Sequence, residues 1–399
     1  MRAVSRRETC LICGASLKGS LILVGLCLCF AAGAMAESAR AGSDFDRWME
    51  SEQGQKASPA QMKQRCDTVM DAEEHLSCSV SVLARLFESK AANLLPEFYL
   101  ATKRRHARAI EQDPELKALF SMFGDQSLEA LRAVGNFSLT RAKQREVLPI
   151  HPFPSDHYVT DEVLPYIEVK AANGVTSRFI VDTGAPQTRV NLDTAKLMGI
   201  QLLPDARYRY STFYGEHDLS ASLGIFESLR IGTSEFRNVL VFVSDRDNLL
   251  GLDLLAKLGR LKVTKKTLTL NAEPPARCDS PITYTRLDIN QRLTLPARLE
   301  HRATVAIIDT GNVDYLTSAL PGSTAIQVTG KPRSQTFRGE LSMGGHIQLS
   351  TYKYFPDFTI PPSMLLGKYV PSILLGWQAF KDFELNLDVD SGRSCFNRI

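Results

Sequence analysis

The sequence lacks an excess of charge of either sign. Its 399 residues carry a formal net charge of +3. The first 36 residues alone hold four basic side chains and one acid, so the rest of the chain is close to neutral. A near-neutral chain has no basic surface stripe for a polyanion. We therefore expect neither a nucleic-acid partner nor an acidic one.

Motifs of several catalytic and ligand-binding classes are also missing. The seven histidines form no His-Glu-Xaa-Xaa-His pattern or other metal-ligand spacing, which argues against a metal centre. There is no Gly-Xaa-Ser-Xaa-Gly motif for a serine nucleophile and no P-loop for a nucleotide. We expect no metal and no cofactor.

The amino terminus lacks an apolar run long enough for a comfortable membrane span. Three arginines precede a short apolar stretch at residues 21–32, and Ala34-Met35-Ala36 follows it. This order is typical of an export signal with a small-Xaa-small cleavage site. We expect residues 1–36 to be a signal peptide, which leaves an exported protein, periplasmic or secreted, without a stable membrane span. An uncleaved anchor is the alternative.

Cysteine is scarce once the leader is set aside. Of eight cysteines, four remain after residue 36, an even number that predicts two disulfides in an exported chain. Cys66 with Cys78 would join two neighbouring helical turns. Cys278 with Cys395 would tie the start of the last unit to its end. Other pairings remain open. The four leader cysteines are Cys10, Cys13, Cys27 and Cys29.

The most informative feature present is a repeated tripeptide. Asp182-Thr183-Gly184 and Asp309-Thr310-Gly311 each follow an apolar run. A buried strand that ends in an acid and a tight glycine turn holds its carboxylate at the rim of a core. Two such acids predict a facing pair that shares one proton, an arrangement suited to acid/base chemistry. Two unrelated turn or cap aspartates are the alternative interpretation.

The repeat extends beyond the tripeptide and predicts a duplicated unit. The acids are 127 residues apart, the two Thr-Phe-Xaa-Gly-Glu pieces 124, and the two Leu-Leu-Gly pieces 125. We place the copies at about residues 158–272 and 283–395. Alternating apolar and polar residues at 166–170, 260–263 and 383–389, and a buried run at 239–243, predict β-strands. A short helix is expected after each Leu-Leu-Gly.

These landmarks resemble the retropepsin/pepsin-like aspartic proteases, over roughly residues 158–395. The chain looks like two retropepsin-sized lobes fused as in pepsin. The resemblance implies a mainly β, bilobal fold with two pseudo-symmetric β lobes, preceded by an α-helical domain. We divide the chain into a signal peptide (1–36), a helical accessory domain (37–146), lobe 1 (147–275) and lobe 2 (276–399).

The resemblance also implies roles for the repeated residues. Asp182 and Asp309 would form the catalytic dyad, and two carboxylates within hydrogen-bonding distance titrate as a unit. Thr183 and Thr310 would brace the two active-site loops against each other. The small residues Gly184, Gly311, Gly251 and Gly376 would let the loops pack closely.

A flap that closes over an extended peptide is implied at the Thr-Phe-Xaa-Gly-Glu pieces. Tyr214-Gly215 suits a hairpin tip, whereas the second copy has Arg338-Gly339 there. We therefore assign Tyr214, Gly215 and Gly339 to substrate binding, with the main flap in lobe 1. Asn312 stands where the family has Ala or Ser. Its amide would either donate to Asp309 or disturb the symmetry of the dyad.

Residues 37–146 carry apolar residues at helical spacing and no catalytic motif. A permanent accessory or docking domain is the favoured interpretation. A pro-segment whose cations at 103–108 cover the acids is the alternative. Prolines at 149, 152 and 154 mark the linker to lobe 1.

Together these patterns predict an exported, monomeric aspartic endopeptidase that cleaves an extended peptide or protein substrate. The alternative is a catalytically inactive aspartic-protease-like protein that binds peptides or scaffolds an envelope complex.

Overall fold

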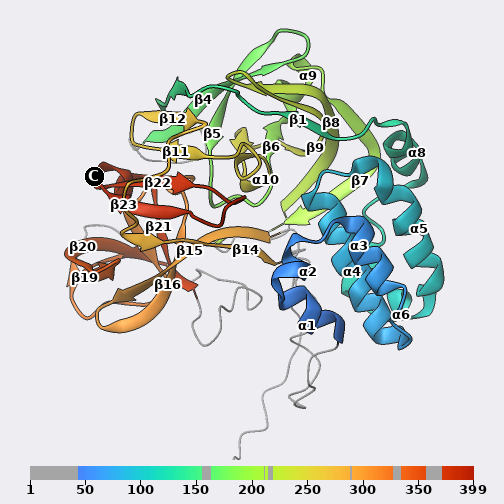
Figure 1. Cartoon of the computed structure of the whole chain (residues 1–399), viewed down its shortest axis with the longest axis horizontal. Helices are drawn as coiled ribbons and strands as arrows, with labels where there is room; N and C mark the ends of the chain where they lie inside the picture. Colours follow the sequence, from blue (N-terminus) through green and yellow to red (C-terminus); the bar gives the residue numbers. More distant parts are fainter. Residues whose placement is uncertain are drawn as a thin grey trace, which may run out of the picture.

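The fold is described from a computed structural model. It describes residues 44–154, 163–210, 212–213, 219–287, 290–326, 334–355 and 371–399. The predicted signal peptide and the predicted flap residues Tyr214 and Gly215 lie outside these ranges. Figure 1 shows two β lobes with a helical region beside the first, so the expected mainly β, bilobal architecture with a preceding helical region is confirmed.

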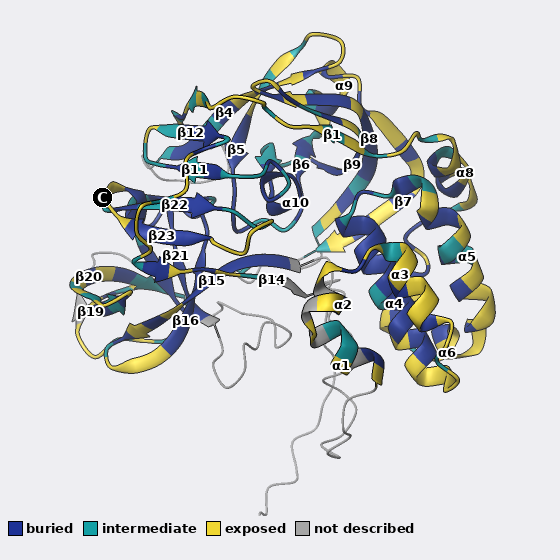
Figure 2. Ribbon diagram, viewed as in Figure 1, coloured by how far each residue is buried: buried dark blue, intermediate teal, exposed yellow. Residues whose placement is uncertain are grey.

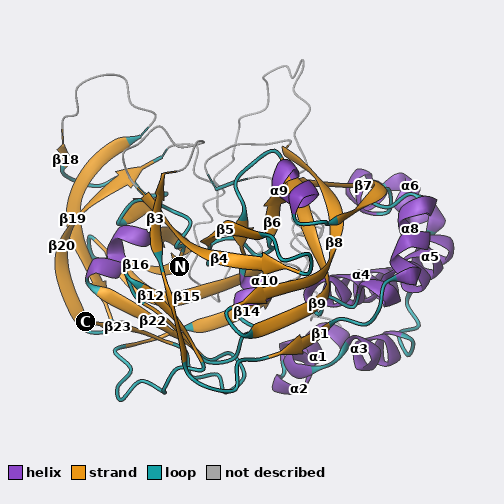
Figure 3. Cartoon of the chain, turned by 90° about the horizontal axis from the view of Figure 1, so that it is seen from above, coloured by secondary structure: helices purple, strands orange, loops and turns teal. Residues whose placement is uncertain are grey.

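The helical region begins at polar caps that the sequence supplies. The Ser58 side chain and Gln61 form a capping box at the start of α3, and the Asp71 side chain accepts from two main-chain N–H groups of α4. In Figure 3 the helices of this region gather at one end of the molecule. They are α1 (Asp44–Glu50), α2 (Glu52–Lys56), α3 (Pro59–Cys66), α4 (Ala72–Glu88), η1 (Ala92–Leu94), α5 (Leu95–Arg105), α6 (Ala107–Gln112), α7 (Pro114–Leu119) and α8 (Asp125–Ala133).

The sheet of lobe 1, called the lobe-1 sheet, provides the surface on which these helices pack. Its strands are β1 (Ser138–Thr140), β3 (His151–Pro154), β4 (Val163–Ala171), β5 (Thr176–Val181), β6 (Arg189–Asn191), β7 (Gln201–Tyr210), β8 (Leu219–Ile231), β9 (Ser234–Ser244) and β10 (Leu249–Leu250). Two short helices, α9 (Leu192–Leu197) and α10 (Leu252–Leu255), belong to the same lobe.

The helical region and lobe 1 share one hydrophobic core. Buried Tyr99 and Leu131 of the helices belong to the same cluster as Leu223, Leu240 and Phe242 of the lobe-1 sheet. Dark blue, buried stretches of α4, β8 and β9 are visible in Figure 2, whereas β7 is largely yellow. Burial of this common apolar surface is the main stabilising term between the two parts.

The β structure begins before residue 147, the residue at which lobe 1 was predicted to start. After α8, β1 pairs with β9, and β2 (Glu146–Pro149) pairs with β12. Residues 138–146 therefore already belong to the β architecture, although they precede the start assigned to lobe 1. A three-residue strand such as β1 has too few alternations to be recognised from sequence.

Lobe 2 repeats the arrangement of lobe 1. Its lobe-2 sheet contains β14 (Thr283–Leu287), β15 (Asn290–Leu299), β16 (Arg302–Ile308), β17 (Leu316–Ser318), β18 (Ala325–Ile326), β19 (Gln335–Met343), β20 (His346–Tyr354) and β21 (Pro371–Leu375). In each lobe the strand before the acid pairs in parallel with the strand of the Leu-Leu-Gly piece: β5 with β10, and β16 with β21. The 3-10 helix η3 (Trp377–Lys381) follows β21.

A third sheet, called the bridging sheet, joins the lobes. It combines β2, β11 (Leu261–Val263), β12 (Thr267–Leu270), β13 (Ser280–Pro281), β22 (Phe383–Leu387) and β23 (Cys395–Arg398). Its central pairing is between β11 of lobe 1 and β22 of lobe 2, with Leu261 opposite Leu387. This sheet sets how the two lobes meet.

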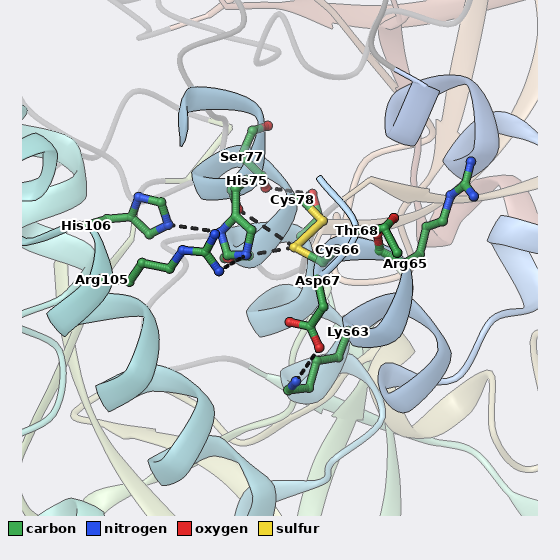
Figure 4. The surroundings of a disulfide bond; sticks show 12 residues. Lys63, Arg65, Cys66, Asp67, Thr68, His75, Ser77, Cys78, Arg105 and His106 are labelled. Atoms are coloured by element: carbon green, nitrogen blue, oxygen red, sulfur yellow. Dashed lines mark hydrogen bonds and ion pairs between the residues drawn. A yellow bond between two sulfur atoms is a disulfide. The ribbon is translucent and has the colours of Figure 1, made fainter. Parts of the chain in front are cut away.

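Both expected disulfides are present. Cys66–Cys78 joins the end of α3 to α4, beside His75 and His106 (Figure 4). Cys278–Cys395 closes a loop of lobe 2 across a sequence separation of 117. In the part of the chain that the structure describes, no helix has the length and apolar character needed to cross a membrane.

Candidate active site

The two repeated acids lie at the ends of equivalent buried strands. Asp182 follows β5 and its main-chain N–H donates to Leu250 O at 3.0 Å. Asp309 follows β16 and its N–H donates to Leu375 O at 2.9 Å. The two residues are 8% and 6% exposed, so each keeps a small contact with solvent.

The carboxyl groups of Asp182 and Asp309 face each other and are hydrogen-bonded. The following glycines make this approach possible. A Cβ at Gly184 would fall 2.1 Å from Asp309 Oδ1, and one at Gly311 would fall 2.4 Å from Asp182 Cγ. Each loop therefore passes directly over the acid of the other lobe, where only glycine fits.

The two threonines cross-link the loops. Thr183 donates its hydroxyl to Ile308 O at 2.8 Å, and Thr310 donates its hydroxyl to Val181 O at 2.6 Å. Each hydroxyl oxygen also accepts the main-chain N–H of the other threonine, at 3.0 and 3.1 Å. Because all four groups are buried and paired, this network holds the acids in register.

The electrostatics of the pair favour one shared proton. Burial raises the pKa of Asp182, against the opposing effect of two main-chain N–H groups and Arg189. Burial and the neighbouring Asp182 raise the pKa of Asp309 well above its usual range, against the opposing effect of Arg292. Two coupled carboxyls of this kind titrate as a unit.

The loops distinguish the two acids. Gly184 and Ala185 both donate main-chain N–H bonds of 2.9 Å to Asp182 Oδ1. Asp309 Oδ1 accepts from Gly311 at 3.1 Å. Hydrogen bonds from N–H groups stabilise the charged form of a carboxylate. Asp182 is therefore the favoured anion, and Asp309 the favoured holder of the proton.

The main chain of Asn312, and not its side-chain amide, accounts for the smaller number of N–H donors to the Asp309 carboxylate. Its side-chain amide does not point to the dyad: Nδ2 donates to Thr317 Oγ1 at 3.0 Å, and Oδ1 accepts from Asp314 N at 3.0 Å. Its main-chain N–H donates to the main-chain O of Asp309 at 3.1 Å. The equivalent N–H in lobe 1, that of Ala185, reaches the carboxylate instead. The asymmetry thus arises from the backbone.

The Leu-Leu-Gly glycines lie against the active-site loops. A Cβ at Gly251 would fall 2.6 Å from the main-chain carbon of Gln187, and one at Gly376 would fall 2.1 Å from Asp314 O. Both contacts are with backbone, which cannot move aside cheaply. The resemblance had implied this close packing.

Gly339 has a different position from that of a hairpin tip. It lies inside β19, opposite Ser350 of β20, and a Cβ there would fall 2.5 Å from Glu300 Oε1. The turn of this hairpin is at Gly344 and Gly345, whose φ values of +53° and +79° favour glycine. The second Thr-Phe-Xaa-Gly-Glu piece therefore lies along a strand, and the hairpin turn falls at the two glycines further along the chain.

Sequence reasoning missed Arg292, which lies beside Asp309. Thr294 of β15 pairs with Ile307 of β16, so continuing the register by two residues places Arg292 level with Asp309. Its guanidinium lies 5.2 Å from the ring centroid of Phe213. In lobe 1 the equivalent register places Leu164 level with Asp182, so the sequence gives no signal for Arg292 until the strand register is known.

Phe213 connects lobe 1 to lobe 2. It belongs to the first Thr-Phe-Xaa-Gly-Glu piece and packs against buried Ile307 and Leu374 of the lobe-2 sheet. Phe213 therefore reaches the other lobe close to the strand that ends at Asp309. Within the described ranges, no group of three or more His, Cys, Asp and Glu side chains is arranged to hold a metal ion.

A comparison with protein families finds a match in lobe 1. Residues 169–257 match the family model described as "gag-polyprotein putative aspartyl protease". The recognition of an aspartic-protease-like chain is confirmed. The matched residues include Asp182 and the first Leu-Leu-Gly piece. No curated protein sequence matches this chain significantly.

Three solved structures are similar to this chain. An aspartic proteinase from Irpex lacteus is 11% identical, with a TM-score of 0.43, covering 64% of this chain and 97% of that one. Basic 7S globulin from soybean is 11% identical, with a TM-score of 0.39, covering 63% and 94%. A retropepsin-like aspartic protease from Rickettsia conorii is 21% identical, with a TM-score of 0.24, covering 34% and 94%.

Proposed function

We propose that this protein is an aspartic endopeptidase. The observation that carries the proposal is the hydrogen-bonded pair Asp182 and Asp309, buried at the ends of equivalent strands and held by the threonine network. Such a pair supplies a base and an acid within one site, at a spacing that needs no metal and no nucleophilic side chain.

The asymmetry of the hydrogen bonds assigns the roles. The Asp182 carboxylate takes a proton from water as the water oxygen attacks the scissile carbonyl carbon. Asp309 donates its proton to the carbonyl oxygen, which yields a neutral diol. Asp182 then protonates the leaving nitrogen as the C–N bond breaks, and Asp309 recovers a proton from the diol. The products are a carboxylic acid and an amine, and the pair again holds one proton.

The substrate in this proposal is an extended peptide or protein segment. The piece that contains Phe213, with Tyr214 and Gly215 after it, forms the flap that covers the peptide from lobe 1. A hairpin in this role gives main-chain hydrogen bonds along the substrate. In this proposal Gly339, which lies within β19, contacts the substrate from lobe 2.

Export completes the proposal. The leader at 1–36 and the disulfides Cys66–Cys78 and Cys278–Cys395 suit an oxidising compartment, periplasmic or extracellular. The enzyme acts as a monomer, because each lobe supplies one acid to the same pair.

Peptide cleavage by the mature chain, purified after export, tests the function. A library of quenched fluorescent peptides is screened from acid to neutral pH, with and without a pepstatin-type inhibitor. We expect cleavage that falls at least about 100-fold in Asp182→Asn and in Asp309→Asn. The exposed Asp193→Asn serves as the matched control, since the Asp193 carboxylate forms a surface ion pair with Lys196 on α9.

Two outcomes would contradict the proposal. Cleavage that survives both substitutions would show a different catalytic group or a contaminant. Peptide binding without any cleavage by the unmodified chain would favour the inactive peptide-binding protein instead.

A further inference from the structure

Lys90 occupies an unusual backbone position at the end of α4. Its N–H donates to Phe87 O and the N–H of Ala91 donates to Leu86 O, the two bonds of a Schellman motif. Lys90 itself has φ of +63°, the left-handed conformation for which glycine is the usual choice. A lysine retained there, at a cost in backbone free energy, indicates that its side chain is needed.

The side chain of Lys90 runs from the helical region into lobe 1. Lys90 is 2% exposed, and its Nζ donates to Gln187 Oε1 and to Leu240 O, each at 3.0 Å. It also forms an ion pair with Asp253, which is fully buried. A buried acid without a cation is strongly unfavourable, so this pair ties the helical region to α10.

Asp253 holds the loop that carries Asp182. Its Oδ1 accepts both the main-chain N–H and the hydroxyl of Thr188, at 2.9 and 2.7 Å. The Thr188 oxygen in turn accepts the N–H of Gly251 at 3.1 Å. The loop from Asp182 to Thr188 is thus fixed at its first residue by β10 and at its last by Asp253, which depends on Lys90 for its charge balance.

In lobe 2 the loop that carries Asp309 is supported by residues of lobe 2 itself. The residue after Leu-Leu-Gly-Trp is Gln378, where lobe 1 has Asp253, so that position carries no buried charge. The cation in lobe 2 is Lys353 of β20, which lies 2.5 Å from Asp314 Oδ1. Lobe 1 instead receives its cation from residue 90, outside the duplicated unit.

We propose that Lys90 is a positioning residue for the Asp182 loop, and that the helical region 44–133 is therefore a permanent part of the catalytic unit. This inference rests on the proposed peptidase function for its kinetic consequence. It excludes the pro-segment interpretation, because removal of the helices would leave Asp253 buried without its cation and would expose the core shared with β7 to β9.

The test compares the mature chain with Lys90→Met, Lys90→Met/Asp253→Asn and the exposed control Lys63→Met. Hydrogen–deuterium exchange reports on residues 183–190, with residues 310–317 of lobe 2 as an internal reference. We expect faster exchange of 183–190 alone in Lys90→Met, with reversal in the double variant.

Kinetics with the best-cleaved library peptide give the second readout. In Lys90→Met, kcat should fall about 10- to 100-fold while KM stays within about twofold. Lys63→Met should behave as the unmodified chain.

The outcomes separate this inference from the proposed function. If the unmodified chain cleaves no peptide, the function fails, but the exchange comparison still decides the role of Lys90. Unchanged exchange and kcat in Lys90→Met, with only a lower melting temperature, would reduce Lys90 to a stabilising residue and overturn the proposal. Mass spectrometry of the active form provides a second test. An active form that lacks residues 44–133 would also overturn the proposal.

If Lys90→Met does not fold, Lys90→Arg replaces it. Arginine keeps the charge, but its larger planar guanidinium cannot place its donors in the compact arrangement of an ammonium group. We then expect a folded protein with faster exchange at 183–190 and lower kcat. Exchange and kcat equal to those of the unmodified chain would overturn the proposal.

Discussion

The guanidinium of Arg292 lies beside the carboxyl group of Asp309, level with it across the β15–β16 ladder. Lobe 1 has a leucine at the equivalent position. Each acid therefore has one arginine that lowers its pKa, Arg189 for Asp182 and Arg292 for Asp309, but the two arginines come from different positions in the two lobes. Since Arg292 lowers the pKa of Asp309 against the raising effects of burial and Asp182, it affects where the pair titrates.

Replacement of Arg292 by methionine should move the pH profile of kcat/KM to higher pH. Without the guanidinium, the anionic forms of the pair lose stabilisation, so both protons leave at higher pH than before. Activity should fall at acid pH and extend further toward neutral pH. The pH dependence of cleavage measures this. Arg292→Lys, which keeps the charge, should shift the profile less, and an unchanged profile in Arg292→Met would contradict the prediction.

Substitution of Gly184 by alanine should abolish most activity and weaken the fold. The new Cβ would lie 2.1 Å from Asp309 Oδ1, so the acids must separate. We expect at least about a 100-fold loss of kcat/KM from misplaced carboxyls, and a loss of about 1–3 kcal/mol in unfolding free energy from overpacking.

Gly174→Ala is the matched control for that substitution. Gly174 has φ of +85°, and a Cβ added there would meet no atom within 4 Å. The change should therefore cost only the backbone strain of about 1–2 kcal/mol, with activity unchanged. Comparable activity losses in the two variants would show that the loss at Gly184 is a folding effect rather than a clash with Asp309.

Replacement of Thr183 by valine should destabilise the protein by about 1–3 kcal/mol. Valine keeps the shape but leaves the buried carbonyl of Ile308 without its 2.8 Å donor, and the N–H of Thr310 without its acceptor. Urea unfolding measures the free energy. Thr183→Ser, which retains the hydroxyl, should recover most of it, and equal losses in the two variants would argue that methyl packing matters instead.

The stability of the helical region should depend on pH through a buried histidine pair. His75 Nδ1 lies 3.0 Å from His106 Nε2, and Arg105 Nη1 lies 2.7 Å from His75 Nε2 (Figure 4). Because Arg105 can only donate, His75 must donate from Nδ1 to His106, which requires neutral rings. Ser79 Oγ is 3.2 Å from His75 Nδ1.

Burial lowers the pKa of both histidines from the usual value of 6.5, and Arg105 lowers the pKa of His75 further. A pKa that is lower in the folded state means that the unfolded chain binds protons more readily. The contribution is therefore complete above pH 6.5 and is lost as the pH falls toward the folded pKa values. Thermal melts from neutral to acid pH should show this loss, and it should be smaller in His106→Gln. Asp67 opposes and Lys63 reinforces the effect on His75.

Much of the β architecture follows from local sequence features. Period-two alternation predicts the strands around Tyr166 and Phe383, and apolar runs that end in Asp-Thr-Gly predict buried strands with an acid at the rim. The repetition of three landmarks at near-constant spacing predicts two equivalent lobes. The cysteine count predicts two disulfides, but it leaves their pairing open. Each of these inferences uses residue types, their number and their spacing, which the chain displays directly.

Other features were decided by tertiary packing. The sequence contains Lys90, but its contact with Gln187 spans 97 residues and depends on how the helices settle on β7 to β9. The side chain of Asn312 turns toward Thr317, although its place in the repeat suggested Asp309. Arg292 becomes significant only when the β15–β16 register places it beside an acid. Local periodicity determines which face of a strand is apolar, whereas partners distant in sequence are selected by the burial and hydrogen-bond requirements of the assembled core.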